Sequence, residues 1–103
     1  MAEITIFWTK TAVKQRNKTF SYWNKRNKST EYSKKLNKNI KERIILLKSN
    51  PKLGKQTDFK RTRMISLGHY SILYKVNNNQ LFITGFWDNR QDPKKLLTFL
   101  KLK

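Results

Sequence analysis

Two apolar runs separated by three consecutive asparagines constrain the fold of this chain more than any other feature. Residues 70–76 (YSILYKV) alternate as a strand does, with Ile72 and Tyr74 on one face. Residues 81–87 (LFITGFW) are apolar on both faces, which is typical of a strand inside a sheet. The asparagines at 77–79 suit the connection, because asparagine tolerates the left-handed backbone region. The pattern predicts a β-hairpin whose second strand has a neighbour on each side.

The first half of the chain predicts a strand followed by two helices. Residues 4–8 alternate as a strand, and Thr9 or Thr11 is suited to cap the helix that follows. One face of that helix consists of Ala12, Arg16, Thr19, Phe20 and Trp23. The second helix is expected to begin near Thr30 and to end before Pro51, because the residue before a proline avoids helical angles. Its apolar stripe consists of Tyr32, Leu36, Ile40, Ile44 and Leu47.

The remaining segments complete an α+β order of elements. Residues 51–60 predict a loop in which Gly54 is able to take a positive φ, and residues 63–67 predict a strand. The Asp-Pro pair at 92–93 predicts the start of a last helix. The side chains expected to dock that helix are Leu96, Leu97 and Leu100. We therefore expect a single domain over residues 1–103, in the order β-α-α-β-β-β-α, with a helical hairpin packed on a mainly antiparallel sheet.

The composition excludes several classes of protein. The chain has no cysteine, which excludes a disulfide scaffold, a thiolate zinc site and a cysteine nucleophile. One histidine and six scattered carboxylates offer no metal-ligand pair, so we expect neither a metal nor another cofactor. No apolar run approaches the roughly 20 residues of a membrane span, and the N-terminal pattern is not that of a signal peptide. A cytoplasmic protein without a membrane partner is expected.

The charge points to a polyanionic partner. Lysine and arginine number 24 against six acidic residues, which gives a net charge of +18. Residues 10–63 hold 18 of these basic residues and only three acidic ones, so the basic face belongs to the first two thirds of the chain. Nucleic acid, the ribosome or an acidic protein are the expected partners. The alternative is compositional bias, because 18 lysines and ten asparagines are also typical of an A+T-rich genome.

The first candidate site is a basic group at the start of the strand at 63–67. Lys60, Arg61 and Arg63 lie within four residues of one another, and Lys55 precedes them in the loop. Cations at this spacing are suited to hold consecutive phosphates, so we predict a nucleic-acid-binding role for all four residues. The alternative is a solvated basic loop.

The other two candidate sites lie at the ends of the predicted hairpin strands. His69 lies in a tight turn, where a lone histidine is often exposed or structural. Asp88 and Arg90 lie where the last apolar strand becomes polar, and Arg90 has the alternative of a structural pair with Asp88 or Asp92. Tyr74 is interpreted as a core residue rather than a catalytic one.

Four local signals, in this order, resemble the RelE/ParE superfamily of type II toxin–antitoxin toxins. They are Trp8 with Ala12, the segment NPKLG at 50–54, the segment YSILY at 70–74 and the segment RQDP at 90–93. The resemblance covers nearly the whole chain. Toxins similar to the RelE branch enter the ribosomal A site and cut mRNA with Lys, Arg and Tyr side chains. Toxins similar to the ParE branch bind DNA gyrase and lack the nuclease residues.

The resemblance implies roles for individual residues. Arg90 matches the strand-end arginine of the family, and Arg61 or Arg63 lies near its second basic position. The chain departs from nuclease members because no tyrosine follows Arg90 and because an Asp-Asn pair at 88–89 stands where others resemble His-Tyr. A proline after Arg-Gln-Asp, as at Pro93, is frequent in ParE-like members. The sequence therefore leaves the branch open.

We expect a toxin that a cognate acidic antitoxin neutralises. The first expectation for its activity is metal-independent, ribosome-dependent mRNA cleavage, in which Arg90 with Arg61 or Arg63 stabilises the phosphorane. His69 and Asp88 are the weaker candidates for a catalytic role. The alternatives are a ParE-like inhibitor of DNA gyrase without nuclease activity and a non-catalytic basic nucleic-acid-binding module.

Overall fold

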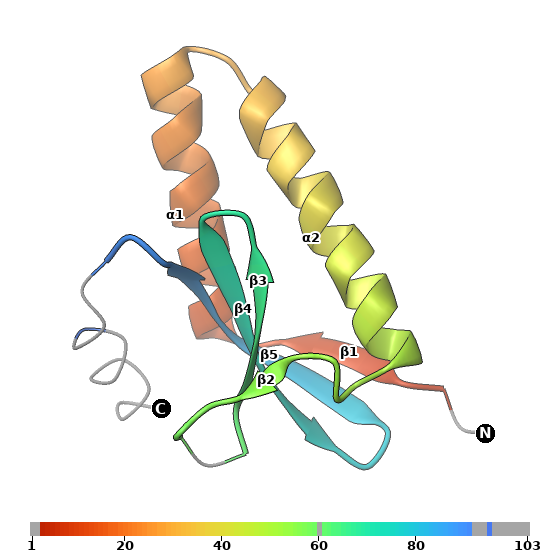
Figure 1. Cartoon of the computed structure of the whole chain (residues 1–103). Helices are drawn as coiled ribbons and strands as arrows, with labels where there is room; N and C mark the ends of the chain where they lie inside the picture. The colour runs from red at the N-terminus through yellow and green to blue at the C-terminus, as the bar shows by residue number, and fades with distance from the viewer. Residues whose placement is uncertain (1–2, 60, 92–94, 96–103) are drawn as a thin grey trace.

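Two long helices lie against one face of a five-stranded sheet in the computed structural model, which describes residues 3–59, 61–91 and 95 (Figure 1). The elements are β1 (Thr5–Trp8), α1 (Lys10–Asn27), α2 (Glu31–Ser49), β2 (Lys55–Gln56), β3 (Arg63–Leu67), β4 (Tyr70–Asn77) and β5 (Gln80–Asp88). The sheet order is β1-β5-β4-β3-β2, with β1 parallel to β5 and the other pairs antiparallel. The predicted α+β class and the mainly antiparallel sheet are confirmed.

The β4–β5 hairpin forms as its apolar pattern predicts. Asn77 pairs with Gln80, so Asn78 and Asn79 make the connection, and Asn78 has a φ of 55°. Because β5 pairs with β1 on one side and β4 on the other, it is an interior strand, as its two apolar faces predict.

The helix ends follow local sequence signals. Thr9 caps α1, since its side-chain oxygen accepts a hydrogen bond from the Ala12 amide at 3.2 Å. α2 ends at Ser49, two residues before Pro51, as predicted. The two helices are joined by Ser33, whose hydroxyl donates to the Phe20 carbonyl at 3.1 Å and lies 2.6 Å from Asn24 Oδ1. These contacts fix the helical hairpin that covers the sheet.

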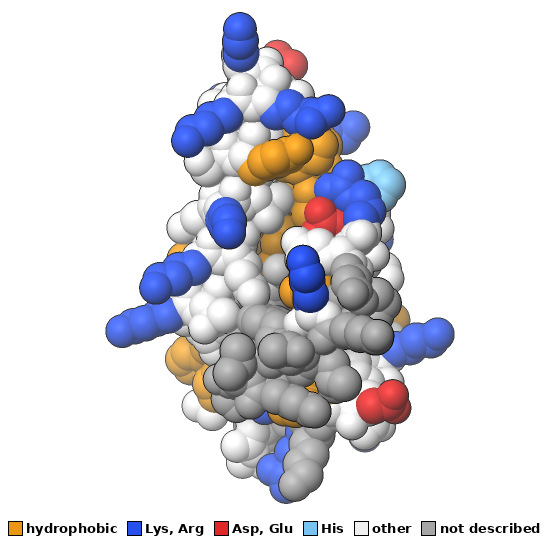
Figure 2. All heavy atoms as spheres, turned by 90° about the vertical axis from the view of Figure 1, so that its left-hand side faces the viewer, with side chains coloured by type: hydrophobic (Ala, Val, Ile, Leu, Met, Phe, Trp, Pro, Cys, Tyr) orange, Lys and Arg blue, Asp and Glu red, His pale blue; other side chains and the backbone are white. Residues whose placement is uncertain are grey.

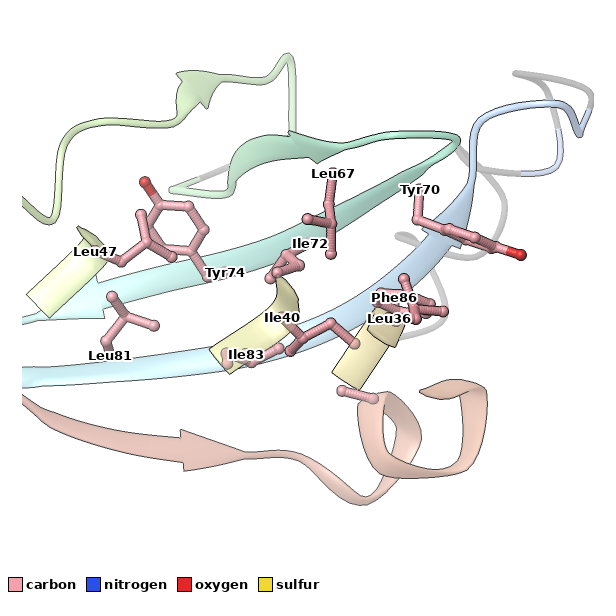
Figure 3. Packing of buried hydrophobic residues seen from close by; sticks show 11 residues of the cluster. Leu36, Ile40, Leu47, Leu67, Tyr70, Ile72, Tyr74, Leu81, Ile83 and Phe86 are labelled. Carbon is pink, nitrogen blue, oxygen red and sulfur yellow. The ribbon is translucent and has the colours of Figure 1, made fainter. Parts of the chain in front are cut away.

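The core lies between the helical hairpin and the sheet. Its buried side chains come from Ala12 of α1, from the predicted stripe of α2 and from the helix-facing side of β3, β4 and β5 (Figure 3). The labelled members are Leu36, Ile40, Leu47, Leu67, Tyr70, Ile72, Tyr74, Leu81, Ile83 and Phe86. Tyr74 is fully buried, which confirms it as a core residue. A smaller cluster of Leu73 and Trp87, with Met64 and Phe59 against it, lies on the other face of the sheet.

The expectation of a loop over residues 51–60 is wrong in part. The predicted loop contains the short strand β2, which pairs with Met64 and Arg63 of β3. Gly54 does not have a positive φ. A glycine is needed there for space, because a Cβ atom would lie 2.6 Å from the hydroxyl oxygen of Tyr74. The positive-φ glycine is Gly68 in the β3–β4 turn.

The predicted last helix, its Asp92-Pro93 start and its three leucines fall outside the residues that the structure describes. Lys60 of the basic group also falls outside them.

Candidate functional site

Arg90 lies just beyond the end of β5 and forms a two-point ion pair with Asp88. Its Nε and Nη2 atoms donate to the two carboxylate oxygens at 2.9 and 2.8 Å, and its backbone amide donates to the same carboxylate at 2.9 Å. These contacts hold the pKa of the Asp88 carboxyl below its ordinary value and raise that of Arg90. The structural pairing named above as an alternative is therefore formed, while 49% of the Arg90 side chain stays exposed.

Two aromatic rings lie beside the Arg90 guanidinium. Its carbon lies 5.9 Å from the ring centroid of Trp23 on α1 and 5.8 Å from that of Tyr70 on β4. Trp23 Nε1 donates to the Tyr70 hydroxyl at 2.6 Å, which joins the helix to the strand end. Tyr70 in turn stacks on Phe86 with centroids 5.0 Å apart. Burial raises the pKa of Tyr70, so this phenol is neutral at physiological pH.

These residues line a cleft of about 570 Å³ between α1 and the ends of β4 and β5, which we call the strand-end cleft. Its lining residues are Gln15, Lys18, Thr19, Tyr22, Trp23, Tyr70, Phe86, Trp87, Asp88, Arg90 and Gln91. The volume lies in the range of small-ligand sites. Figure 2 shows apolar side chains exposed between basic ones in the upper half of one face.

A second arginine–tyrosine arrangement lies at the middle of β4, four residues along the strand from Tyr70. The Tyr74 hydroxyl donates to the Pro51 carbonyl at 2.9 Å and accepts from the Gly54 amide at 2.8 Å. Arg63 Nη1 donates to the carbonyls of Gly54 and Lys52 at 2.8 and 3.3 Å. Burial raises the pKa of Tyr74. Arg63 thus holds the loop after α2, which is a structural role that the sequence did not indicate.

Arg61 and Lys55 of the predicted basic group are exposed near the Tyr74 position. Arg61 has a φ of 55° and, with Arg63 and Lys52, borders a second cleft of about 480 Å³. Lys55 is exposed on the edge strand β2, opposite Met64 of β3. Phosphate binding by Arg61 and Lys55 remains a prediction.

The structure does not bring Arg90 together with Arg61 and Arg63. Arg63 is opposite Tyr74, whereas Asp88 is opposite Tyr70. Four residues of extended strand separate these two positions by about 13 Å along β4. Of the other predicted residues, His69 lies exposed in the β3–β4 turn at the Arg90 end, where its carbonyl accepts from the Asn89 amide at 2.8 Å.

Sequence reasoning missed the aromatic wall of the strand-end cleft. It placed Trp23 on a core-facing side of α1 and did not single out Tyr22, which is 52% exposed. A signal was present, since Tyr22 lies four residues from both Lys18 and Arg26 in a helix without an acidic residue. An exposed aromatic residue between two cations at this spacing is typical of a binding surface rather than of a core stripe.

The residues that the structure describes contain neither a cluster of metal ligands nor a membrane-spanning helix. Within residues 3–59, 61–91 and 95, no three His, Asp or Glu side chains lie where they would hold a metal ion. None of the helices described is long and apolar enough to cross a membrane.

Comparison with known proteins gives one family and several similar structures. The family described as "ParE toxin of type II toxin-antitoxin system, parDE" matches residues 6–93. A structure of the "Chromosomal ParDE TA system from P. aeruginosa" superposes with a TM-score of 0.71 at 17% identity, covering 84% of this chain and 96% of that one. The isolated E. coli RelE toxin superposes with a TM-score of 0.59 at 13% identity, covering 99% of this chain and 100% of that one.

YafQ from E. coli strain BL21(DE3) gives a TM-score of 0.52 at 13% identity, with 84% of this chain and 93% of that one covered. At such identities the structural likeness shows a shared fold. No curated protein sequence matches significantly.

Proposed function

The chain belongs to the family of ParE toxins of type II toxin–antitoxin systems, and we propose from this that it is a non-enzymatic toxin that inhibits DNA gyrase. The family match over residues 6–93 carries the proposal. The resemblance drawn from the sequence implies the same target for the ParE branch, whose members lack the nuclease residues. The positions of the arginine side chains are a second argument for gyrase inhibition over mRNA cleavage.

The positions of the arginines support a binding role over a catalytic one. Stabilising a phosphorane requires positive groups that converge on one phosphate within hydrogen-bond distance. Arg63 is opposite Tyr74 of β4, whereas Asp88, the partner of Arg90, is opposite Tyr70, and these two positions are about 13 Å apart along the strand. This separation supports a binding role over the paired catalytic site expected for the nuclease.

The bonding of each arginine adds to this argument. The Arg90 guanidinium already shares its charge with the Asp88 carboxylate at 2.8–2.9 Å. Arg63 donates to two backbone carbonyls of the loop after α2. Neither arginine therefore directs all of its donors at a reacting phosphate, which favours a binding role over a catalytic one.

Ribosome-dependent mRNA cleavage is the second candidate function. The observation in its favour is the net charge of +18, which suits a site walled by ribosomal RNA. In that case Arg90 or Arg61 would act at its own end of the sheet, rather than the two together. Replacing Arg90 with alanine would then abolish cleavage and leave the fold intact.

The test compares the two targets with the same purified toxin. DNA gyrase is assayed on relaxed plasmid, and translating ribosomes are assayed for mRNA cut at the A-site codon. Polylysine at matched positive charge is the control for a cation that merely coats DNA. We expect the toxin, and not polylysine, to block supercoiling and to leave linearised plasmid with gyrase, while mRNA stays intact. Cut mRNA with unaffected gyrase would instead assign the nuclease function.

We also propose that the cognate antitoxin is acidic and covers an exposed apolar patch at the end of α2. This patch consists of Ile45, Leu46 and Leu53, which are 62%, 46% and 47% exposed. Lysines at 41, 48 and 52 surround these positions in the sequence, so an acidic amphipathic helix suits the patch. The product of an adjoining short reading frame should restore growth and bind the toxin. Replacing Ile45 with glutamate should weaken that complex, and replacing exposed Lys38 with alanine should affect it less.

A further inference from the structure

The side chains of the strand-end cleft are suited to bind a ligand other than the proposed protein target. We propose that this cleft and the adjoining face of α1 bind single-stranded nucleic acid. A base stacks on Tyr22 beside Trp23, while Lys18, Arg26 and Arg90 hold the flanking phosphates.

The charge of α1 supports an anionic ligand on this face. The helix contains six basic residues and no acidic one. Lys18, Tyr22 and Arg26 recur every four residues and therefore form one stripe, with steps of about 6 Å along the helix axis. Arg90 approaches the same aromatic group from the end of β5. The cations therefore flank the exposed ring from two elements of the structure.

The aromatic side chains provide a surface for stacking. Tyr22 is 52% exposed and meets Trp23 edge-on, with centroids 5.1 Å apart and the ring planes at 86°. Its hydroxyl accepts a hydrogen bond from Arg26 Nη1 at 3.2 Å, which holds the ring in place. Trp23 is anchored by its bond to Tyr70 and has guanidinium carbons of Arg26 and Arg90 5.8 and 5.9 Å from its centroid. Such an ordered ring between cations is the arrangement that binds unpaired bases.

The geometry favours a nucleic acid strand over an extended acidic peptide. β4 and β5 both pair with neighbours on each side, so the cleft offers no free strand edge for backbone pairing. Duplex nucleic acid is disfavoured because its base faces are stacked within the helix. The ligand class is therefore a single strand, read by its bases and phosphates without a fixed sequence.

The test is the anisotropy of a fluorescein-labelled oligothymidylate of about ten nucleotides, titrated with the full chain at several salt concentrations. Replacing Tyr22 with alanine should weaken binding about 5- to 100-fold, the range typical of a lost stacking residue. Tyr22→Phe should retain most of the affinity, because the ring remains. Phe7→Ala, at another exposed aromatic position outside the cleft, should bind as the parent does.

A second pair of variants tests the cations and does not depend on the fold around Tyr22. Lys18→Ala and Lys38→Ala remove the same charge from exposed helical positions, and only Lys18 lines the cleft. Lys18→Ala should reduce the slope of log affinity against log salt by about 0.7, and Lys38→Ala should leave it nearly unchanged.

Three results would overturn the proposal. They are parent-like binding by Tyr22→Ala, equal effects of Lys18→Ala and Lys38→Ala, and competition by polyglutamate that matches that of unlabelled oligothymidylate. The gyrase assay is separate, so failure there leaves this test unaffected.

Discussion

Two positions on strand β4, at the two ends of the core cluster, carry the same pair of residue types in different environments. At one end Tyr70 lies beside Arg90, and at the other Tyr74 lies beside Arg63. The Tyr74 hydroxyl has both a backbone acceptor and a buried backbone donor as partners, and Arg63 binds the carbonyls of the same loop. The Tyr70 hydroxyl accepts from Trp23 and has a longer contact of 3.5 Å with Arg90. Figure 3 shows the two hydroxyls at opposite ends of the core cluster.

The two ends differ in role, because the Tyr74 end is suited to stabilise the fold and the Tyr70 end is suited to bind a ligand. At the Tyr74 end the tyrosine hydroxyl and the Arg63 Nη1 atom bind backbone groups of one loop, so the arrangement fixes that loop. At the Tyr70 end the arginine has an acidic partner in a half-exposed ion pair, which contributes little to stability. An anionic ligand can replace that partner, so this end is the one suited to binding. The following changes test the contrast.

The largest expected effect comes from replacing Gly54 with alanine. The new Cβ atom would lie 2.6 Å from the Tyr74 hydroxyl oxygen and 3.0 Å from the Met64 carbonyl oxygen. Relieving this overlap should lower the free energy of unfolding by about 3 kcal/mol, measured by chemical denaturation. Gly68→Ala is the matched control. It meets no atom within 4 Å but has a φ of +62°, so only about 1 kcal/mol is expected. Equal losses of unfolding free energy in the two variants would show that the close approach of Tyr74 does not require glycine at position 54.

Removing each tyrosine hydroxyl should give the next largest effect. Tyr74→Phe leaves the Gly54 amide and the Pro51 carbonyl without their partner, and should cost about 2 kcal/mol. Tyr70→Phe leaves one partly buried donor, Trp23 Nε1, and should cost about 1 kcal/mol. Thermal unfolding of both variants measures the difference. A larger loss for Tyr70→Phe would reverse the assignment of the structural end.

Replacing each arginine with alanine should have opposite orders of effect on stability and on oligothymidylate binding. Arg63→Ala removes two charged hydrogen bonds to the loop carbonyls and should lower stability by about 1.5 kcal/mol. Arg90→Ala breaks a half-exposed ion pair and should change stability by less than about 1 kcal/mol. Oligothymidylate binding should show the opposite order, with the larger loss for Arg90→Ala. If Arg63→Ala weakened that binding more, the cleft would be misassigned.

The smallest effect is the pH dependence of the Asp88–Arg90 pair. Arg90 holds the pKa of Asp88 below its ordinary value of 3.8, so the folded state favours the ionised carboxyl. The resulting stabilisation is present above the pKa of the unfolded chain and is lost as the pH falls through the lower folded value. Denaturation curves between neutral pH and about pH 3 should show this loss, and Asp88→Asn should reduce it. An unchanged acid response in Asp88→Asn would show that the pair does not contribute.

Asp88→Asn also links the pair to binding. The substitution removes the carboxylate that competes with phosphate for Arg90, so oligothymidylate should bind more tightly. Weaker binding would show that Asp88 positions Arg90 rather than competing for it.

Local sequence patterns predict the described helices and strands other than β2, and much of the core. The apolar stripe of α2, the exact bounds of β3 and the interior place of β5 all follow from local patterns, because burial on one face or two leaves a periodic trace in the chain. Motifs in the right order also indicated the toxin superfamily. Each of these features depends on residues that are close together in the sequence.

The grouping of the candidate residues depends on tertiary structure. Arg90 was expected to act with Arg61 or Arg63, and the antiparallel register places Arg63 opposite Tyr74 and Asp88, the partner of Arg90, opposite Tyr70. Trp23 meets Tyr70 across 47 residues of sequence, and no periodicity reports such a contact. Gly54 is required because a tyrosine 20 residues away approaches its Cα, and not for its own backbone angles. Contacts between distant segments depend on strand register and packing, which local patterns do not encode.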